Sequence, residues 1–322
     1  MPKAFPTRRK WFSMDSNGHR SVLLRECVEG LKIKGNGIYA DGTLGGGGHA
    51  KEIAARLTAG RLIGIDRDGE ALRIASANLA GFTNVDIVRG NFSDIKNVLR
   101  GLGVSGLDGL LLDLGVSSFQ IDEAGRGFSY MSDERLDMRM DSETSPSAYE
   151  VVNGYEAGRL AEIIFRYGEE KNARKIAKAI EERRKTKVIL TTSELAETVR
   201  KALPTTGESH PEKRTFQAIR IHVNDELRSL ETLLDSLPDI MNAGGRVCVV
   251  SFHSLEDRII KNVFREYENP CVCPRDLPVC VCGKAPSFKV ITKKPVLPGK
   301  DEIISNPRSK SAKLRIAEKI NR

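Results

Sequence analysis

Apolar and polar positions follow two different periods in the first third of the chain. Short apolar runs, which are typical of buried strands, occur at residues 37–40, 64–66, 85–89 and 107–113. Helical periodicity occupies the segments between them, at residues 50–57, 70–79 and 95–102. Alternation of strands and helices predicts a parallel sheet with helices on both faces, so the predicted fold class is α/β.

The strand pattern stops in the middle of the chain and returns near its end. Helical faces replace it, formed by Leu160, Ile163, Ile164 and Tyr167, and by Ala173, Ile176, Ala177 and Ile180. Strand signals resume at residues 244–252, 288–292 and 312–316. We therefore predict a discontinuous sheet domain over residues 1–118 and 225–322, with an all-helical domain inserted at residues 119–224.

Glycine dominates the turn after the first predicted strand, in the stretch Asp41-Gly-Thr-Leu-Gly-Gly-Gly-Gly-His49. Because glycine has no Cβ, this turn can bend sharply and approach a bound ligand closely. The strand after the next helix ends on Asp66, whose carboxylate can accept hydrogen bonds from both hydroxyls of a ribose. We interpret the unit as a nucleoside-cofactor site.

Two cofactors fit this loop on its residues alone. The stretch Gly45-Gly-Gly-Gly-His-Ala50 satisfies the G-x-G-x-x-A form of the dinucleotide fingerprint, which would indicate a nicotinamide-dependent dehydrogenase. The methyltransferase pattern, acidic-x-G-x-G-x-G, starts instead at Asp41 and has Thr43 in place of its first glycine. Asp41 favours the methyltransferase, because a carboxylate can hold the amino-acid end of S-adenosylmethionine but would repel a pyrophosphate.

Three carboxylates fall at the ends of predicted strands, namely Asp41, Asp66 and Asp113. Asn91 and Phe92 follow another predicted strand in the same way. Ligands of open parallel sheets bind in the crevice beyond the carboxyl ends of the strands. We therefore expect these residues to converge on the cofactor site.

Composition is that of an ordinary soluble globular protein, with 322 residues, 40% hydrophobic residues and 29 glycines. The apolar runs are shorter than the roughly 18 residues of a membrane-spanning helix, and the basic start leads into no signal-type apolar core, so the cytoplasm is the expected location. The formal net charge of +8 suits a polyanionic partner but is equally typical of a solvated surface.

Seven motifs carry a more specific resemblance. In order, they are His19-x-x-Val22-Leu-Leu, Asp41-Gly-Thr-Leu-Gly-Gly-Gly-Gly-His49, Asp113-Leu-Gly-Val-Ser-Ser118, Arg126-Gly-Phe-Ser129, Leu136-Asp-Met-Arg-Met-Asp141, Arg214-Thr-Phe-Gln-Ala-Ile-Arg220 and Ser251-Phe-His-Ser-Leu-Glu-Asp-Arg258. Together they resemble the 16S ribosomal RNA (cytosine-N4)-methyltransferase family, known as RsmH or MraW, from about His19 to Glu318.

The resemblance implies a Rossmann-like class I S-adenosylmethionine-dependent methyltransferase sheet, with the helical insert recognising substrate. It implies methyl transfer from S-adenosyl-L-methionine to the exocyclic amine of a cytidine in the decoding region of 16S ribosomal RNA, presented as RNA or as a ribosomal particle. The alternatives from other classes are the nicotinamide-dependent dehydrogenase and a non-catalytic RNA-binding protein that retains a nucleoside pocket.

The family's cofactor contacts carry over by position to Gly47, Gly48, His49, Asp66, Phe92, Asp113 and Gln120. Taken singly, Phe92 could be core, Gln120 a surface residue and His49 a helix-start residue, and only their convergence favours the cofactor. Many amino-methyltransferases have an acidic or amide residue, two prolines and an aromatic where this chain has Asp113-Leu-Gly-Val-Ser. The group that holds the target amine is therefore open.

Catalysis of this methyl transfer depends mainly on alignment, because the sulfonium already makes the methyl group electrophilic while the cytidine amine is a poor nucleophile. The candidate catalytic residues are Asp113, Asp137 and His253. Further candidates for handling the substrate are Arg139, Asp141, Ser251 and Ser254. The alternative for residues 137–141 is a structural salt-bridge cluster.

Two segments are candidates for RNA binding. Basic residues crowd one helical stretch, at Lys171, Arg174, Lys175, Lys178, Arg183, Arg184, Lys185 and Lys187. Glutamates are interleaved with them, so a solvated face is the alternative. Arg126-Gly-Phe-Ser-Tyr130 is the better candidate, since arginine and aromatic side chains can stack on unpaired bases, and its alternative is a packed loop.

Four of the six cysteines lie close together in the sequence, as Cys271-Val-Cys273 and Cys280-Val-Cys282. Four thiols at this spacing resemble the ligands of a tetrahedral structural zinc, although C-x-C is tighter than the usual C-x-x-C. The alternative is a reduced loop without metal. Cys27 and Cys248 lie in apolar contexts and are expected in the core.

Overall fold

The computed structural model describes residues 21–117, 120, 125–144, 146–203, 210–274, 279 and 281–320. Three residues named in the sequence motifs, His19, Ser118 and Cys280, lie outside these ranges. The chain divides into one unit formed by Met1–Gly115 and Thr232–Arg322 and another formed by Val116–Glu231. The second boundary lies inside α11 (Glu226–Ile240).

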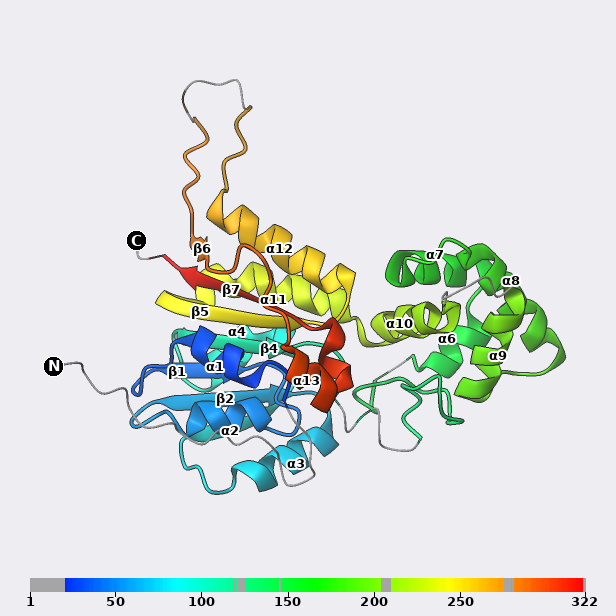
Figure 1. Cartoon of the computed structure of the whole chain (residues 1–322), viewed down its shortest axis with the longest axis horizontal. Helices are drawn as coiled ribbons and strands as arrows, with labels where there is room; N and C mark the ends of the chain where they lie inside the picture. The colour runs from blue at the N-terminus through cyan, green and yellow to red at the C-terminus, as the bar shows by residue number, and fades with distance from the viewer. Residues whose placement is uncertain are drawn as a thin grey trace. The chain divides into compact units, whose positions relative to one another are not determined.

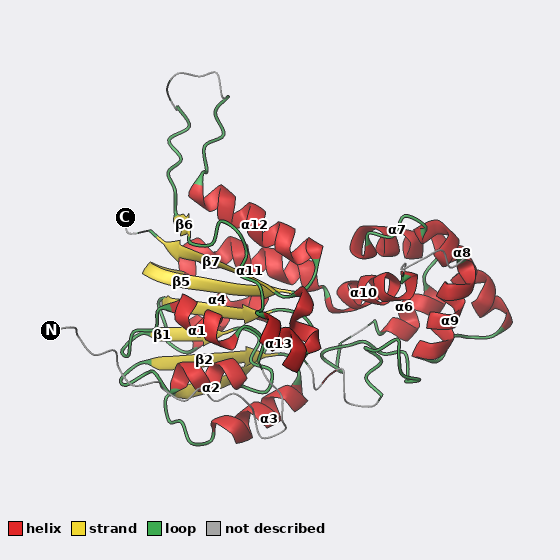
Figure 2. Cartoon of the chain, in the orientation of Figure 1, coloured by secondary structure: helices red, strands yellow, loops and turns green. Residues whose placement is uncertain are grey.

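A seven-stranded sheet forms the centre of the first unit (Figure 1, Figure 2). In chain order its strands are β1 (Ile38–Asp41), β2 (Arg61–Asp66), β3 (Val85–Arg89), β4 (Leu107–Asp113), β5 (Met241–Ser251), β6 (Phe288–Val290) and β7 (Lys313–Lys319). The order across the sheet is β3-β2-β1-β4-β5-β7-β6. The predicted α/β class is confirmed.

The sheet is mixed rather than wholly parallel. Neighbours from β3 through β5 pair in parallel, as predicted, whereas β7 runs antiparallel to β5 and β6 runs antiparallel to β7. Antiparallel strands need no crossover helix between them, so the last two strands follow each other through a connection with only the short α13 (Lys300–Ser305) and η2 (Pro307–Ser311).

Helices cover both faces of this sheet. In Figure 1, α1 (Leu24–Leu31), α2 (Gly48–Ala54) and α3 (Gly69–Leu79) lie in front of the strands, and α4 (Ile95–Gly101) lies behind them. The front helices share one apolar core with the sheet, which includes Leu31, Ile53 and Leu79. Such burial gives roughly 25 cal/mol per Å² of apolar surface, so it outweighs the weak helix preference of seven- or eight-residue segments such as α1 and α2.

The second unit has its own helical core. Its helices are α6 (Ala148–Gly154), α7 (Ala157–Gly168), α8 (Ala173–Thr186), α9 (Thr192–Ala202) and α10 (Pro211–Asn224). The predicted faces are buried in this core, with Ile164 and Ile180 both at 0% exposure. Thr191 caps the start of α9, because its hydroxyl accepts a hydrogen bond from the Glu194 amide at 3.3 Å.

Each of these two units buries an apolar interior of its own. Throughout the described ranges, we find no helix whose length and hydrophobicity would let it cross a bilayer.

Candidate cofactor and substrate sites

The carboxyl ends of the parallel strands bring the predicted acidic residues together. Asp41, Asp66 and Asp113 are the last residues of β1, β2 and β4. The register sets Asp41 opposite Gly64 in β2 and opposite Leu111 in β4, two residues short of the carboxylates that end those strands. The three carboxylates therefore lie at one edge of the sheet, as predicted.

Backbone hydrogen bonds hold the glycine-rich loop against this edge. The Gly42 amide donates to the carbonyl of Leu111 at 2.9 Å, and the Gly45 amide donates to Oδ2 of Asp66 at 2.8 Å. Gly47 has φ of +82°, a conformation that a residue with a Cβ rarely adopts. The loop thus spans from the end of β4 to the end of β2 before α2 begins at Gly48.

Gly42 leaves room beside Phe92. A Cβ at Gly42 would lie 2.6 Å from Cδ2 of Leu112 and 3.1 Å from Cβ of Phe92, which is too close without a shift of both. Phe92 is 8% exposed and begins η1 (Phe92–Asp94), directly after β3. Phe92 therefore lies beside the glycine-rich loop, where the strand-end argument expects it.

Thr43 is the loop residue whose role the sequence did not reveal. Its hydroxyl accepts a hydrogen bond from the Asp113 amide at 2.6 Å, and its own amide donates to Oδ1 of Asp41 at 3.2 Å. Thr43 therefore links the ends of β1 and β4, through its amide on one side and its hydroxyl on the other. The only signal for it was the replacement of a glycine in the loop pattern by a residue with a hydroxyl.

Burial makes this edge a costly place for negative charge. Burial raises the pKa of Asp41 from 3.8 to about 7, and its side chain is almost wholly enclosed. Burial also raises the pKa of Asp66, although hydrogen bonds from the Asp68 and Gly45 amides counteract part of the effect. A cation bound here would relieve the cost, because it favours the ionised carboxylates.

Asp113 is the most strongly perturbed of the three. Burial, followed by the charge of Asp41, raises its pKa well above the ordinary value. Its Oδ1 is buried and accepts no hydrogen bond from any residue that the structure describes. Its Oδ2 lies 3.7 Å from Nδ1 of His49. A buried acceptor without a donor is unfavourable by itself, so the atom is suited to a group brought by a ligand.

His49 and Gln120 occupy different surroundings. The His49 side chain is buried, and its Nε2 lies 3.1 Å from the Val22 carbonyl, so the ring connects the start of α2 with the segment before α1. Gln120 belongs to the second unit, where its Oε1 accepts a hydrogen bond from the Ser117 amide at 3.0 Å. The other residues predicted to bind the cofactor all lie in the first unit.

His253 caps a helix at the end of β5. It precedes α12 (Ser254–Glu268), and its Nδ1 accepts from the Glu256 amide at 3.4 Å. The buried Glu256 carboxylate in turn accepts from the amides of Phe252 at 2.8 Å and His253 at 3.2 Å. These contacts give His253 a clear structural role, and its predicted part in catalysis stays a prediction.

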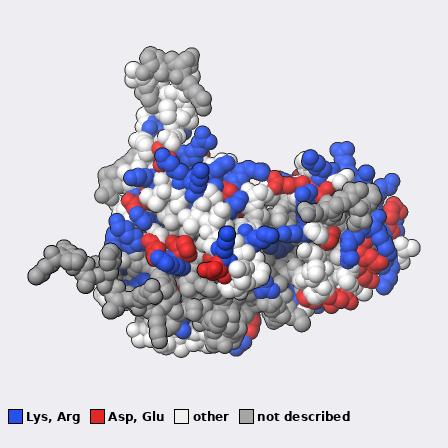
Figure 3. Space-filling model, viewed as in Figure 1, with Lys and Arg blue, Asp and Glu red and all other residues white. Residues whose placement is uncertain are grey.

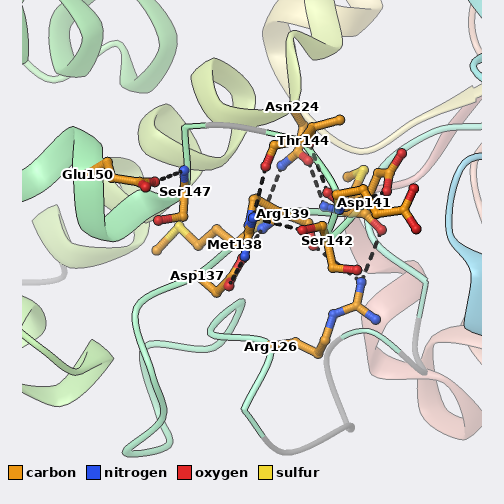
Figure 4. A network of polar contacts seen from close by, with 12 residues as sticks. Arg126, Asp137, Met138, Arg139, Asp141, Ser142, Thr144, Ser147, Glu150 and Asn224 are labelled. Carbon is orange, nitrogen blue, oxygen red and sulfur yellow. Dashed lines mark hydrogen bonds and ion pairs between the residues drawn. The ribbon is translucent and has the colours of Figure 1, made fainter.

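Asp137 and Arg139 form an ion pair inside a loop of the second unit (Figure 4). The Arg139 guanidinium donates to both Asp137 oxygens at 2.7 Å and also to the carbonyls of Ser142 and Thr144. Burial opposes ionisation of Asp137, but the hydrogen bonds and charge of Arg139 outweigh it and lower the pKa of the carboxyl. Asp141 accepts from the Glu143 amide at 3.1 Å in the same loop.

Asn224 ties this loop to α10. Its Oδ1 accepts from the Met140 amide at 2.8 Å and its Nδ2 donates to the Met138 carbonyl at 2.7 Å. Leu136, Met138 and Met140 are buried, so apolar side chains alternate with the charged ones along the motif. Nothing near Asn224 in the sequence indicates this role, because its partners lie more than 80 positions earlier.

The segment around Arg126 is closely packed. A Cβ at Gly127 would lie 2.3 Å from the Arg135 carbonyl, and φ of Gly127 is +73°. The Arg126 guanidinium donates to the carbonyls of Arg139 and Met140, and it lies 5.9 Å from the Phe128 ring centre. These contacts are those of the packed-loop alternative, and RNA stacking by this segment stays a prediction.

Ion pairs involve the C-terminal part of the basic helical stretch. Lys185 pairs with Glu182 at 2.9 Å, and Lys187 pairs with Glu194 at the same distance. Figure 3 shows blue and red side chains interleaved over the second unit at the right of the view. A solvated face explains this pattern, and phosphate binding by α8 stays a prediction.

Comparison with known proteins gives similarity over nearly the whole chain. The model of the MraW methylase family matches residues 16–320. Ribosomal RNA small subunit methyltransferase H of Clostridium botulinum (strain Kyoto / Type A2) is 52% identical over 305 residues, covering 94% of this chain and 99% of that protein. The protein of the same name in Clostridioides difficile (strain 630) is 52% identical over 307 residues, with coverage of 94% and 99%.

Proposed function

Because the chain belongs to the MraW methylase family, we propose that it transfers the methyl group of S-adenosylmethionine to N4 of a cytidine in the decoding region of 16S ribosomal RNA. The chain is a ribosomal RNA methyltransferase with a Rossmann-like class I methyltransferase fold. The position on the base, the region of the RNA and the roles of individual residues are our proposal.

The observation that supports the cofactor is the cluster of carboxylates at the strand ends. S-adenosylmethionine carries a sulfonium and an ammonium, and both favour a site lined by Asp41, Asp66 and Asp113. The pyrophosphate of a nicotinamide cofactor would meet the same carboxylates and be repelled. The residues present therefore fit the methyl donor, and the dehydrogenase is disfavoured.

We assign parts of the cofactor to the residues around this edge. Asp66 would hold the ribose hydroxyls, Phe92 would lie beside the adenine, and Asp41 would face the amino-acid end. Gly47, Gly48 and His49 would line the loop, and a role for Gln120 in cofactor binding stays a prediction. The bound cofactor supplies an electrophilic methyl group, and the chain supplies the alignment.

Asp113 is our candidate for holding the target amine. The lone pair of the cytidine amine is delocalised into the ring, so an acceptor for one amine hydrogen would favour the pyramidal geometry needed for attack. Oδ1 of Asp113 is an acceptor with no donor among the described residues. A carboxylate with a raised pKa could also take the proton released after methylation.

The function is tested by labelled methyl transfer. Small subunits and naked ribosomal RNA from a strain that lacks the enzyme are incubated with methyl-labelled S-adenosylmethionine, and the product nucleoside is identified and mapped. We expect N4-methylcytidine in the decoding region. Label on another base would contradict the proposed position, and no transfer to either substrate would favour the non-catalytic RNA-binding protein. Comparing the two substrates distinguishes naked RNA from the particle.

Substitution of Asp66 tests the cofactor site. Asp66→Ala is expected to weaken S-adenosylmethionine binding by about 10- to 100-fold, because hydrogen bonds to a charged group contribute roughly 1.5–3 kcal/mol. Isothermal titration calorimetry measures the change. Asp86→Ala is the control, since this aspartate of β3 pairs with Arg61 at the start of β2, at the opposite end of that strand from Asp66. Equal affinity of Asp66→Ala and the unsubstituted protein would remove Asp66 from the site.

Substitution of Asp137 separates substrate handling from loop structure. Asp137→Ala leaves the partly buried Arg139 without its ion-pair partner, and we expect about 1–3 kcal/mol of lost stability together with a raised KM for the RNA substrate. Glu143→Ala in the same loop is the exposed control. If Asp137→Ala unfolds at a lower temperature but keeps kcat and KM at a temperature where it is folded, its role is structural alone.

A further inference from the structure

We propose that Cys271, Cys273 and Cys282 bind a structural zinc ion that holds together the extended segment between α12 and β6. The sulfur atoms of these three residues all lie within 4.8 Å of one another. The Sγ atoms of Cys271 and Cys282 are 3.9 Å apart. In a tetrahedral site with Zn–S distances of about 2.3 Å, neighbouring sulfur atoms are separated by about 3.8 Å.

The same distance argues against a disulfide between Cys271 and Cys282. A disulfide requires about 2.05 Å between its sulfur atoms, far less than the observed separation. The Val281 amide donates a hydrogen bond to Sγ of Cys273 at 3.4 Å. Amide donors of this kind stabilise thiolate ligands, because they offset the negative charge that gathers around the metal.

Hydrophobic packing does not hold this segment together, since Cys271 is exposed and Cys273 and Cys282 are only partly buried. The valines that alternate with the cysteines are exposed, with Val272 at 67%, Val279 at 70% and Val281 at 76%. In an extended chain, alternate side chains point to opposite sides. If the cysteine sulfur atoms on the two sides of this segment converge, the valines between them face outwards. An apolar core therefore does not account for the convergence of the thiols.

The base of the segment is fixed to the first unit. The Ser287 amide donates to the Tyr267 carbonyl at 2.9 Å, and the Tyr267 and Phe288 rings stack with their centres 5.3 Å apart. Beyond this base, Figure 1 shows two orange arms that extend from the end of α12 and return to β6. A metal ion bound by the cysteines would join the two arms. Its binding free energy would then contribute to the folding stability of the segment.

The chemistry of the ligands selects the metal. Clustered thiolates favour zinc or an iron–sulfur cluster over magnesium or calcium, which prefer oxygen ligands. We choose zinc because structural zinc sites are closed and tetrahedral, and because the segment lies outside the strand-end site where the reaction is proposed. Cys280 is outside the described residues, and the experiment below tests whether it is the fourth ligand.

Metal analysis of the full-length protein tests this proposal. Protein purified with reductant from zinc-supplemented medium is expected to contain about one zinc per chain by mass spectrometry of the metal. Cobalt exchanged into the site should give the absorption bands of tetrahedral thiolate coordination. Cys271→Ser and Cys282→Ser should lose the metal, while Val272→Ser, an exposed residue between two of the ligands, should keep it. Loss of the metal in the Cys280→Ser variant would identify Cys280 as the fourth ligand.

A second experiment uses the unsubstituted protein, so it does not require a cysteine variant to fold. Chelation of the unsubstituted protein is expected to accelerate trypsin cleavage after Lys284, and added zinc should reverse the effect. Methyl transfer should continue at low temperature, because the metal takes no part in the reaction. Protein that contains no zinc and shows no cobalt bands would overturn the proposal, as would an iron chromophore or a disulfide found by thiol titration.

Discussion

Asp113→Ala is expected to lower kcat for methyl transfer by about 10²- to 10³-fold, the usual size of the effect when one positioned catalytic group is removed. Asp113 is the last residue of β4, and its Oδ1 has no hydrogen-bond donor among the described residues. Its strongly raised pKa shows that the site tolerates the charge poorly without a ligand. Single-turnover assays at saturating cofactor measure the change in the chemical step.

The Asp113→Asn variant tests whether Asp113 acts as a hydrogen-bond acceptor or through its negative charge. An amide oxygen can still accept a hydrogen bond from the target amine, so this variant should keep much more activity than Asp113→Ala. Thermal unfolding serves as the control for structure, since loss of a buried carboxylate with a raised pKa should not destabilise the protein at neutral pH. If the alanine variant turns over at the full rate with saturating cofactor, Asp113 does not hold the amine.

The chain pattern predicted the site mainly because the chemistry lies at strand ends. Apolar runs that stop at Asp41, Asp66 and Asp113 identify both the strands and their last residues, and parallel pairing brings such ends to one edge. The direction of β7 could not be predicted in the same way. Alternation along a strand reports which face is buried, whereas the pairing direction depends on a partner far away in the sequence.

Within each unit, some contacts could not be predicted from a local sequence pattern. Asn224 binds a loop that precedes it by more than 80 residues, and Thr43 acts through the amide of Asp113. The helix α12 was missed because its cap is His253, whereas the usual cap residues are Ser, Thr, Asp and Asn. The helix α11 was missed although it is amphipathic, and it contains Pro238, which usually ends a helix.

Asp41→Asn is expected to stabilise the protein at alkaline pH while weakening the cofactor site. The folded-state pKa of Asp41 is raised from 3.8 to about 7, so ionising this carboxyl costs stability as the pH rises between these values. Each unit of pKa difference corresponds to about 1.36 kcal/mol, which gives at most about 4 kcal/mol above pH 7. The neutral amide avoids this cost and can still accept a hydrogen bond from the Thr43 amide.

The sign of the pH dependence identifies the cause. Because the pKa is raised on folding, the stability of the unsubstituted protein is complete below about pH 4 and declines as the pH rises towards 7. The advantage of Asp41→Asn in the free energy of unfolding should therefore grow by roughly 2–3 kcal/mol between pH 5 and pH 8. Asp235→Asn, at an exposed position of α11, should show no such growth.

The same variant tests why the site keeps a costly carboxylate. If Asp41 faces the ammonium group at the amino-acid end of S-adenosylmethionine, then the cofactor should stabilise the unsubstituted protein more than Asp41→Asn, and the difference should increase with pH as the carboxylate ionises. Thermal scans with and without cofactor at pH 5 and pH 8 measure both effects together. A variant that gains stability and binds the cofactor with unchanged affinity would show that Asp41 shapes the loop through Thr43 but does not attract the ligand.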